Sequence, residues 1–151
     1  MSAFAAFLHH LCFLAIMLTV FVEMLLLRQP LTLASARKIL RYDAIYGIAA
    51  GLVIVVGVLR VLYFEKGSAY YLHSAPFIAK MLLFLIVGLL SIYPTMTFLK
   101  WKTALQQDRI PQISDAQRRT LGLVMHVEGS LLVLMILCAT MMAKGIGYLG
   151  N

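Results

Sequence analysis

The sequence predicts an all-α integral membrane protein, an up-down four-helix bundle that forms one domain over residues 1–151. Three observations support this class: 62% of the 151 residues are hydrophobic, only 13% are charged, and the apolar residues form four long runs. A soluble domain carries about a quarter charged residues, and so apolar a chain could not cover its core with polar surface. The composition therefore excludes an ordinary soluble domain, a disordered chain, a nucleic-acid-binding module and a disulfide scaffold.

The four apolar runs cover about residues 3–27, 42–64, 76–99 and 121–143. A helix needs about 20 apolar residues to cross a bilayer, whereas a membrane β-strand needs about ten alternating residues. The first run lacks the basic segment and short apolar core of a cleaved signal peptide, so we expect it to persist as a span. Short connections between the runs predict that consecutive helices are antiparallel neighbours.

Local signals indicate where these helices begin and bend. Pro76 falls in the first turn of the third run, where its missing N–H costs nothing. Ser114 begins a capping-box pattern before the fourth run. Pro94 is expected to kink or end the third helix, because an interior proline removes a backbone hydrogen bond. Gly47 and Gly51 have the spacing that lets another helix approach closely.

The connections between the runs differ in basic residues. Nine lie in the first and third connections, and three lie at or beyond the other ends of the runs. Basic loops stay in the cytoplasm, so we expect a multi-pass protein of the bacterial inner membrane with both termini outside. A nucleic-acid partner is not expected. The nine are Arg28, Arg37, Lys38, Arg41, Lys100, Lys102, Arg109, Arg118 and Arg119, and the three are Arg60, Lys66 and Lys144.

One polar layer is predicted in the outer half of the membrane. His9 lies roughly 9 Å, and Lys80 roughly 11 Å, outward of the midpoints of their spans. Ionisable residues inside a membrane indicate function by default, and histidine is a common haem ligand. We therefore expect His9 to bind the metal of a haem, Lys80 to bind the iron or a haem carboxylate, and Arg60 to bind a haem carboxylate. Alternatively, His9 only hydrogen-bonds a neighbouring helix, and Lys80 extends to the membrane surface.

A second polar layer is predicted in the cytoplasmic half and contains Glu23, Asp43 and His126. His9 and Glu23 are fourteen residues apart, about 40° short of four helical turns, so they share a face of the first span. His126 and Glu128 are about 200° apart on their helix, so at most one of them faces a given partner. Alternatively, these carboxylates only pair with basic residues near the membrane surface.

Two uncommon strings carry a resemblance. The first comprises Leu59-Arg60, Phe64-Glu65-Lys66-Gly67 and Tyr70-Tyr71, and the second is Gly88-Leu89-Leu90-Ser91-Ile92-Tyr93-Pro94-Thr95. With these strings the whole chain resembles an uncharacterised bacterial family of small four-helix membrane proteins, a domain of unknown function. This resemblance implies a structural class but no activity.

A more distant resemblance concerns His9 and Lys80. Three segments of this chain are similar to segments of the small membrane protoporphyrinogen oxidases: Leu8-His9, the basic run at residues 37–42, and Lys80 followed by Met81-Leu82-Leu83. The chain is also similar in layout to the copper-resistance membrane domains. The resemblance to the oxidases implies that His9 ligates haem and that Lys80 is essential. Where those oxidases carry a His-Gly pair, this chain has residues 91–94 without histidine.

Together these observations favour a b-type haem protein with a redox role, in which haem b is the cofactor. A porphyrinogen or a quinol is the candidate electron donor, so the chain would be a membrane oxidoreductase. The expected partners are the lipid bilayer, a membrane redox protein or quinone, and a second copy of the chain. Two alternatives stay open: a non-enzymatic interaction or assembly protein without cofactor, and a small transporter or proton-conducting component that uses the polar residues of both layers.

Overall fold

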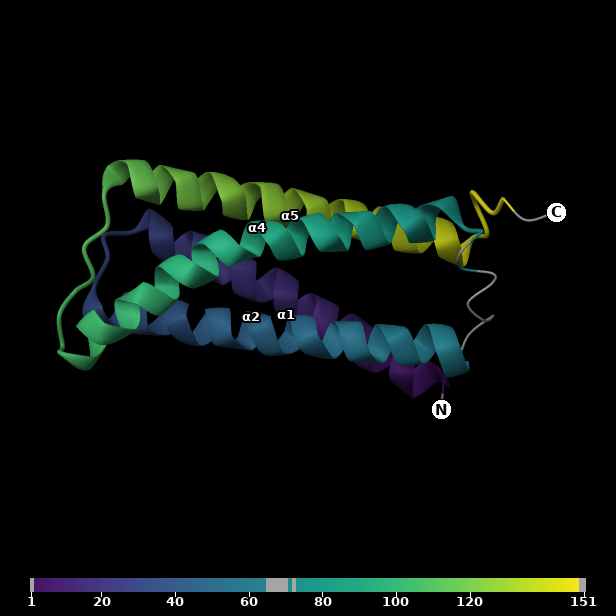
Figure 1. Cartoon of the computed structure of the whole chain (residues 1–151), viewed down its shortest axis with the longest axis horizontal. Helices are drawn as coiled ribbons and strands as arrows, with labels where there is room; N and C mark the ends of the chain where they lie inside the picture. Colours follow the sequence, from purple (N-terminus) through teal and green to yellow (C-terminus); the bar gives the residue numbers. More distant parts are fainter. Residues whose placement is uncertain (1, 65–70, 72, 150–151) are drawn as a thin grey trace.

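The computed structural model describes residues 2–64, 71 and 73–149. Within this part of the chain four long helices form a bundle: α1 (Ser2–Arg28), α2 (Leu33–Leu59), α4 (Ala75–Gln106) and α5 (Asp115–Ala143). A short π-helix, η1 (Arg60–Phe64), extends α2. The helices alternate in direction, with two short connections at one end and both termini at the other (Figure 1). The predicted all-α, up-down four-helix bundle is therefore confirmed.

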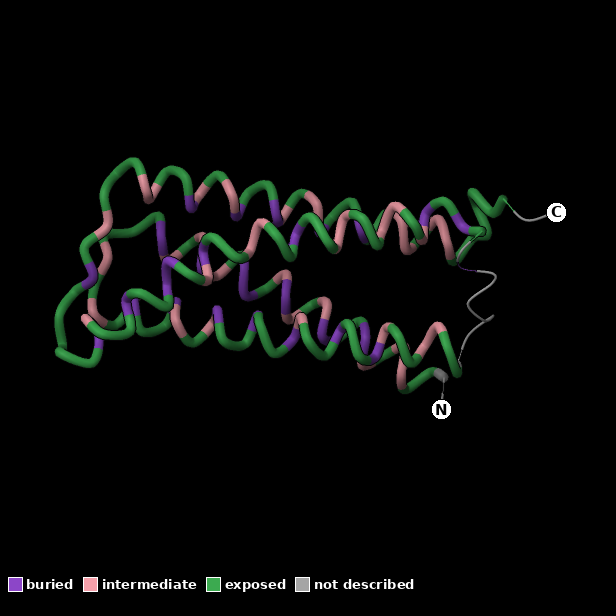
Figure 2. Tube along the Cα trace, in the orientation of Figure 1, coloured by how far each residue is buried: buried purple, intermediate pink, exposed green. Residues whose placement is uncertain are grey.

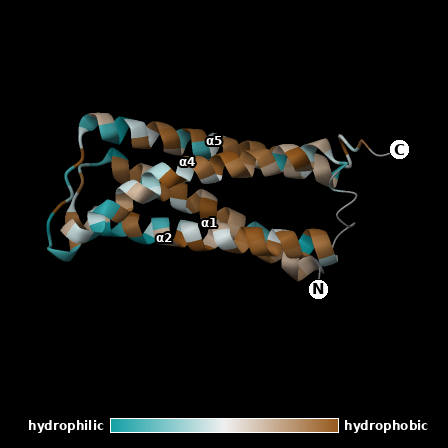
Figure 3. Cartoon of the chain, in the orientation of Figure 1, coloured by the Kyte–Doolittle hydropathy of each residue, from teal (hydrophilic) through white to brown (hydrophobic). Residues whose placement is uncertain are grey.

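The two ends of the bundle differ in character. We call the end with the connections 29–32 and 107–114 the loop end, and the opposite end the terminal end. Hydrophilic residues gather at the loop end, whereas most of the remaining helix length is hydrophobic (Figure 3). All four helices are long and apolar enough to cross a membrane. Many outward-facing side chains are large and apolar, Phe7 and Leu85 among them, as expected for a surface covered by lipid.

At the loop end the helices extend beyond the predicted spans. α2 begins at Leu33 rather than near residue 42, because Thr32 and Ser35 form a capping box that precedes the apolar run. The Ser35 N–H donates to Thr32 Oγ1 at 3.1 Å, and the Thr32 N–H donates to Ser35 Oγ at 2.9 Å. Arg37 and Arg41 therefore lie on the first turns of α2 instead of in a loop.

α4 continues through Pro94, so the proline does not end the helix. Instead α4 changes direction: its first part runs beside α5, and its last part crosses toward α2 (Figure 1). An interior proline produces such a bend. Pro76 lies in the first turn of α4, as predicted. Ser114 caps α5 by accepting the Gln117 N–H at 3.2 Å, which is one half of the predicted capping box.

The core lies between two helix pairs, since α1 packs mainly against α2 and α4 packs mainly against α5. Buried residues follow the inward faces of all four helices (Figure 2). A Cβ added at Gly47 or Gly51 would meet no atom within 4 Å. The close helix approach that these two glycines predict is therefore not made within the described part of this chain.

The Arg118 side chain of α5 caps the C-terminal end of α1. Arg118 donates from Nη1 to the carbonyl oxygens of Leu27, at 2.6 Å, and Gln29, at 2.8 Å. The last carbonyls of a helix have no partner within it, so this guanidinium caps α1 from a neighbouring helix. At the terminal end the Ala75 N–H donates to the Gly147 carbonyl at 3.0 Å, which returns the chain after α5 to the start of α4. Residues 65–70 of the second predicted connection, which include Lys66, lie outside the described residues.

Candidate functional site

Toward the terminal end, the basic layer is formed by His9 of α1, Arg60 at the start of η1 and Lys80 of α4. The His9 ring is buried and lies within electrostatic range of both Lys80 and Arg60. Lys80 in turn lies within range of Cys138 of α5. The structure therefore brings together the three residues that the sequence placed in one layer, and all four long helices or their extensions border the site.

The His9 ring packs against α2. A Cβ at Gly57 would lie 3.3 Å from His9 Cε1 and 3.6 Å from Nδ1, so the ring fills space that any side chain at this position would need. The Val53 carbonyl, one turn earlier on α2, also lies beside the ring. The Nδ1 atom is buried and has no hydrogen-bond partner. Buried polar atoms are normally paired, so an unpaired ring nitrogen marks a position suited to binding a ligand.

The neighbouring His10 has a different environment. Its side chain is exposed, and its Nδ1 atom lies 2.6 Å from the Ala6 carbonyl oxygen of the preceding turn. The His9 and His10 rings meet edge to face with centroids 6.0 Å apart. His9 and Glu23 thus share the buried face of α1, whereas His10 faces outward.

Nearer the loop end, the acidic layer is formed by Glu23 of α1, Asp43 of α2 and Glu128 of α5. All three side chains are buried, and each lies within electrostatic range of the other two. Fourteen residues of α1 separate Glu23 from His9, which corresponds to about 21 Å of helix. The basic and acidic layers are therefore separate sites.

Hydroxyl groups line the acidic layer. Thr95 of α4 donates from Oγ1 to Asp43 Oδ1 at 2.7 Å. Tyr46 of α2 is buried, lies within range of all three carboxyl groups, and is beside the Ser91 hydroxyl of α4. Neither Tyr46 nor Thr95 was predicted as a site residue, because uncharged polar residues are common in membrane helices and carry little signal alone.

The structure does not bring His126 into the acidic layer, so its predicted place there was wrong. The His126 side chain is exposed, with Nε2 3.0 Å from Arg28 Nη2 and Nδ1 2.6 Å from the Gly122 carbonyl oxygen. Glu128 takes the inward position instead. In the structure the buried residues of α5 recur at alternating spacings of four and three, and Glu128 lies on that stripe. The stripe is Leu121, Met125, Glu128, Leu132 and Met135.

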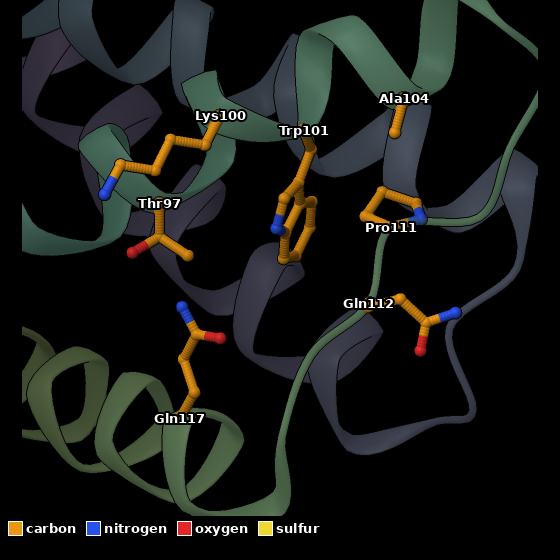
Figure 4. Close-up of a pocket in the computed structure, with 7 residues that line it drawn as sticks. All are labelled: Thr97, Lys100, Trp101, Ala104, Pro111, Gln112 and Gln117. Atoms are coloured by element: carbon orange, nitrogen blue, oxygen red, sulfur yellow. The ribbon is translucent and has the colours of Figure 1, made fainter.

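A pocket of about 240 Å³ lies at the loop end, away from both layers (Figure 4). Gln117 of α5 points toward Thr97 and Trp101 of α4, whereas the Lys100 side chain extends away from the indole (Figure 4). The other lining residues are Ala104, Pro111 and Gln112. The pocket places no cluster of charged groups around a common point, so the two buried layers are the stronger candidates for chemistry.

The described residues contain no group of three or more His, Cys, Asp or Glu side chains that could hold a metal ion. A metal centre built from such side chains alone is therefore not found in this part of the chain. A metal ion bound by His9 would need further ligands from a cofactor, as the iron of haem has from its porphyrin.

Comparison with known proteins places the chain in a family but supplies no activity. No curated protein and no solved structure gives a significant match. A family model described as "Predicted membrane protein (DUF2214)" matches residues 1–147, nearly the whole chain. This match agrees with the four apolar helices and with the resemblance to a family of unknown function. The chain therefore belongs to the DUF2214 family of predicted membrane proteins.

Proposed function

We propose that the protein is a b-type haem membrane protein with a redox role, and that the basic layer is its haem-binding site. The observation that carries the proposal is the buried Nδ1 atom of His9, which has no hydrogen-bond partner and lies in the same site as Lys80 and Arg60. Histidine is the usual axial ligand of haem iron, so His9 is the proposed ligand.

The surroundings of His9 suit this role. A ligating histidine normally donates one ring N–H to a carbonyl or carboxylate, and the Val53 carbonyl of α2 lies beside this ring. Lys80 and Arg60 supply positive charge for the carboxylates of a porphyrin. Buried apolar side chains of α1 and α2, Cys12 and Val56 among them, keep water from the ring.

A bound haem b would supply one-electron chemistry at this site. The protein's own contribution is to orient the His9 imidazole against α2, to hold acidic substituents with Lys80 and Arg60, and to exclude water. A porphyrinogen or a quinol is the proposed electron donor, and a quinone or a membrane redox protein the proposed acceptor. A quinol or a quinone is apolar enough to reach a buried site through the lipid-facing surface.

We also propose that the loop end faces the cytoplasm of a bacterium, with both termini outside the inner membrane. The basic residues support this orientation, because Arg28, Arg37, Lys100 and Arg118 all belong to the loop end. The basic layer would then lie in the outer half of the bilayer.

Absorption spectroscopy of the full chain, purified in detergent after expression with a haem precursor, tests the proposal. The wild-type protein should show a Soret band when oxidised and resolved α and β bands after reduction with dithionite. His9→Ala should abolish or sharply lower the haem content, whereas His10→Ala is the matched control and should retain it. A wild-type protein without visible absorption, or stoichiometric haem in His9→Ala, would contradict the proposal.

A further inference from the structure

The acidic layer is not used by the proposed haem site and requires its own explanation. Carboxylates are costly inside a membrane, and like charges that share a small apolar space repel one another. Here three carboxyl groups from three helices share the bundle interior. None of the three forms an ion pair with a basic side chain of the described residues.

Two of these carboxyl groups also have an unpartnered oxygen. Glu23 is 3% exposed and Glu128 is 1% exposed, and the Oε1 atom of each has no hydrogen-bond partner. A buried acceptor without a donor is costly, so these atoms indicate a ligand that can donate a hydrogen bond to them.

The groups around the acidic layer indicate that this ligand is a proton. The groups that face the layer are Glu23 from α1, Asp43 and Tyr46 from α2, and Glu128 from α5, while α4 contributes the hydroxyls of Ser91 and Thr95. The described residues provide no cluster of side chains able to hold a metal ion. A proton bound to one carboxyl group removes its charge and becomes a donor to the next.

We propose that the acidic layer is a proton-binding site, in which Glu23, Asp43 and Glu128 share protons, each proton adding to a carboxylate to form a neutral carboxyl group. Tyr46 and Thr95 supply further hydroxyl groups to the network. The site exists with or without haem, so this inference stands apart from the proposed function.

Buried apolar side chains enclose the acidic layer on both sides. Toward the loop end they include Leu27, Ile39, Phe98 and Met125, and toward the basic layer they include Ile16, Val87 and Leu132. The buried Thr19 hydroxyl in the same region is satisfied by the carbonyls of Ala15 and Ile16. In the other direction Glu23 lies five residues from the end of α1, about 7.5 Å of helix. We therefore expect the protons to stay within the acidic layer rather than to pass through the bundle.

Of the three carboxyl groups, that of Asp43 is the best placed to exchange protons. Asp43 is 7% exposed, more than Glu23 or Glu128, and it faces Thr95 across the α2–α4 contact. We expect protons to enter through Asp43 and to move from there to the two glutamic acids.

Infrared spectroscopy of the full chain in lipid nanodiscs, prepared without haem, tests the site. The wild-type protein should show carbonyl-stretch bands of protonated carboxyl groups at neutral pH. The frequency of these bands should shift when the protein is exchanged into D2O. Glu23→Gln and Glu128→Gln should each remove part of this signal. Asp115→Asn, which changes an exposed carboxyl group at the start of α5, is the matched control and should leave it unchanged.

If either glutamine variant does not fold, the wild-type protein with 13C-labelled glutamate carboxyls assigns the bands without substitution. Absence of protonated carboxyl bands at neutral pH, or identical bands in both glutamine variants and the wild type, would overturn the proposal. The absence of proton conduction through the bundle is tested with protein reconstituted into vesicles that enclose a pH-sensitive dye. The dye signal should match that of empty vesicles after an external pH jump, and rapid acidification of the interior would show that the bundle conducts protons.

Discussion

The imidazole ring of His9 packs directly on the backbone of Gly57. α1 thus approaches α2 at a glycine, which has no side chain to occupy the space of the ring. A Cβ at position 57 would lie 3.3 Å from His9 Cε1, closer than most side-chain contacts. The ring orientation is therefore set jointly by two helices, and the unpartnered Nδ1 atom is held in the basic layer by this contact.

This contact predicts a selective effect of Gly57→Ala. The added methyl group should displace the ring by a few tenths of an ångström, because close-packed interiors transmit such changes. We expect lower haem retention and a shifted reduction potential, measured by spectrophotometric redox titration. Gly51→Ala is the matched control, since a Cβ at that position would meet no atom within 4 Å, and its titration should match the wild type.

Lys80→Met should separate two roles of the lysine. If the amine ligates iron, the absorption spectrum should shift. If the ammonium group pairs with a porphyrin carboxylate, the spectrum should persist while haem is lost more readily to apomyoglobin. Lys100→Met, an exposed change at the loop end, is the control. An unchanged spectrum together with unchanged haem loss would exclude Lys80 from the site.

The hydrogen bond between Thr95 and Asp43 should contribute measurably to stability. Thr95→Val keeps the shape of the side chain and removes its donor, which should lower the free energy of unfolding by about 1 kcal/mol. Titration with sodium dodecyl sulfate measures this change. A double-mutant cycle with Asp43→Asn should show coupling between the two sites, whereas the exposed change Thr103→Val should be close to neutral and additive.

Arg118→Ala should destabilise the loop end, because it leaves the carbonyls of Leu27 and Gln29 without their donor. The expected loss is about 1–3 kcal/mol, since the donor is charged. Arg119→Ala changes an exposed neighbouring arginine and is the matched control. Thermal unfolding followed by circular dichroism compares the two, and equal midpoints would show that the cap does not stabilise the bundle.

Reporter fusions test the proposed orientation. Fusions within the connections 29–32 and 107–114 should be active as cytoplasmic reporters, because basic loops are retained on that side. A fusion after Leu149 should behave as a periplasmic reporter. The opposite pattern at both connections would invert the molecule and place the basic layer in the cytoplasmic half of the bilayer.

Composition and local periodicity determined much of this protein from the sequence alone. Four apolar runs long enough to cross a bilayer permit only helices, because each backbone polar group must be satisfied within its own segment. The choice of His9 over His10 for the buried face also follows from the sequence, since one helix has one period and Glu23 sets its phase. The sequence also contains the N-cap residue of α2, Thr32, although a search for apolar residues alone does not detect it.

Only the tertiary structure decided which polar residues meet. In a membrane helix both the lipid-facing and the protein-facing sides are apolar, so hydrophobic periodicity does not reveal how far the helix is rotated toward its neighbours. That rotation decides that Glu128 rather than His126 faces inward. It also decides that Tyr46 and Thr95 lie beside the carboxyl groups. The contact between His9 and Gly57 depends on the distance between two helix axes, which packing sets and neither segment encodes alone.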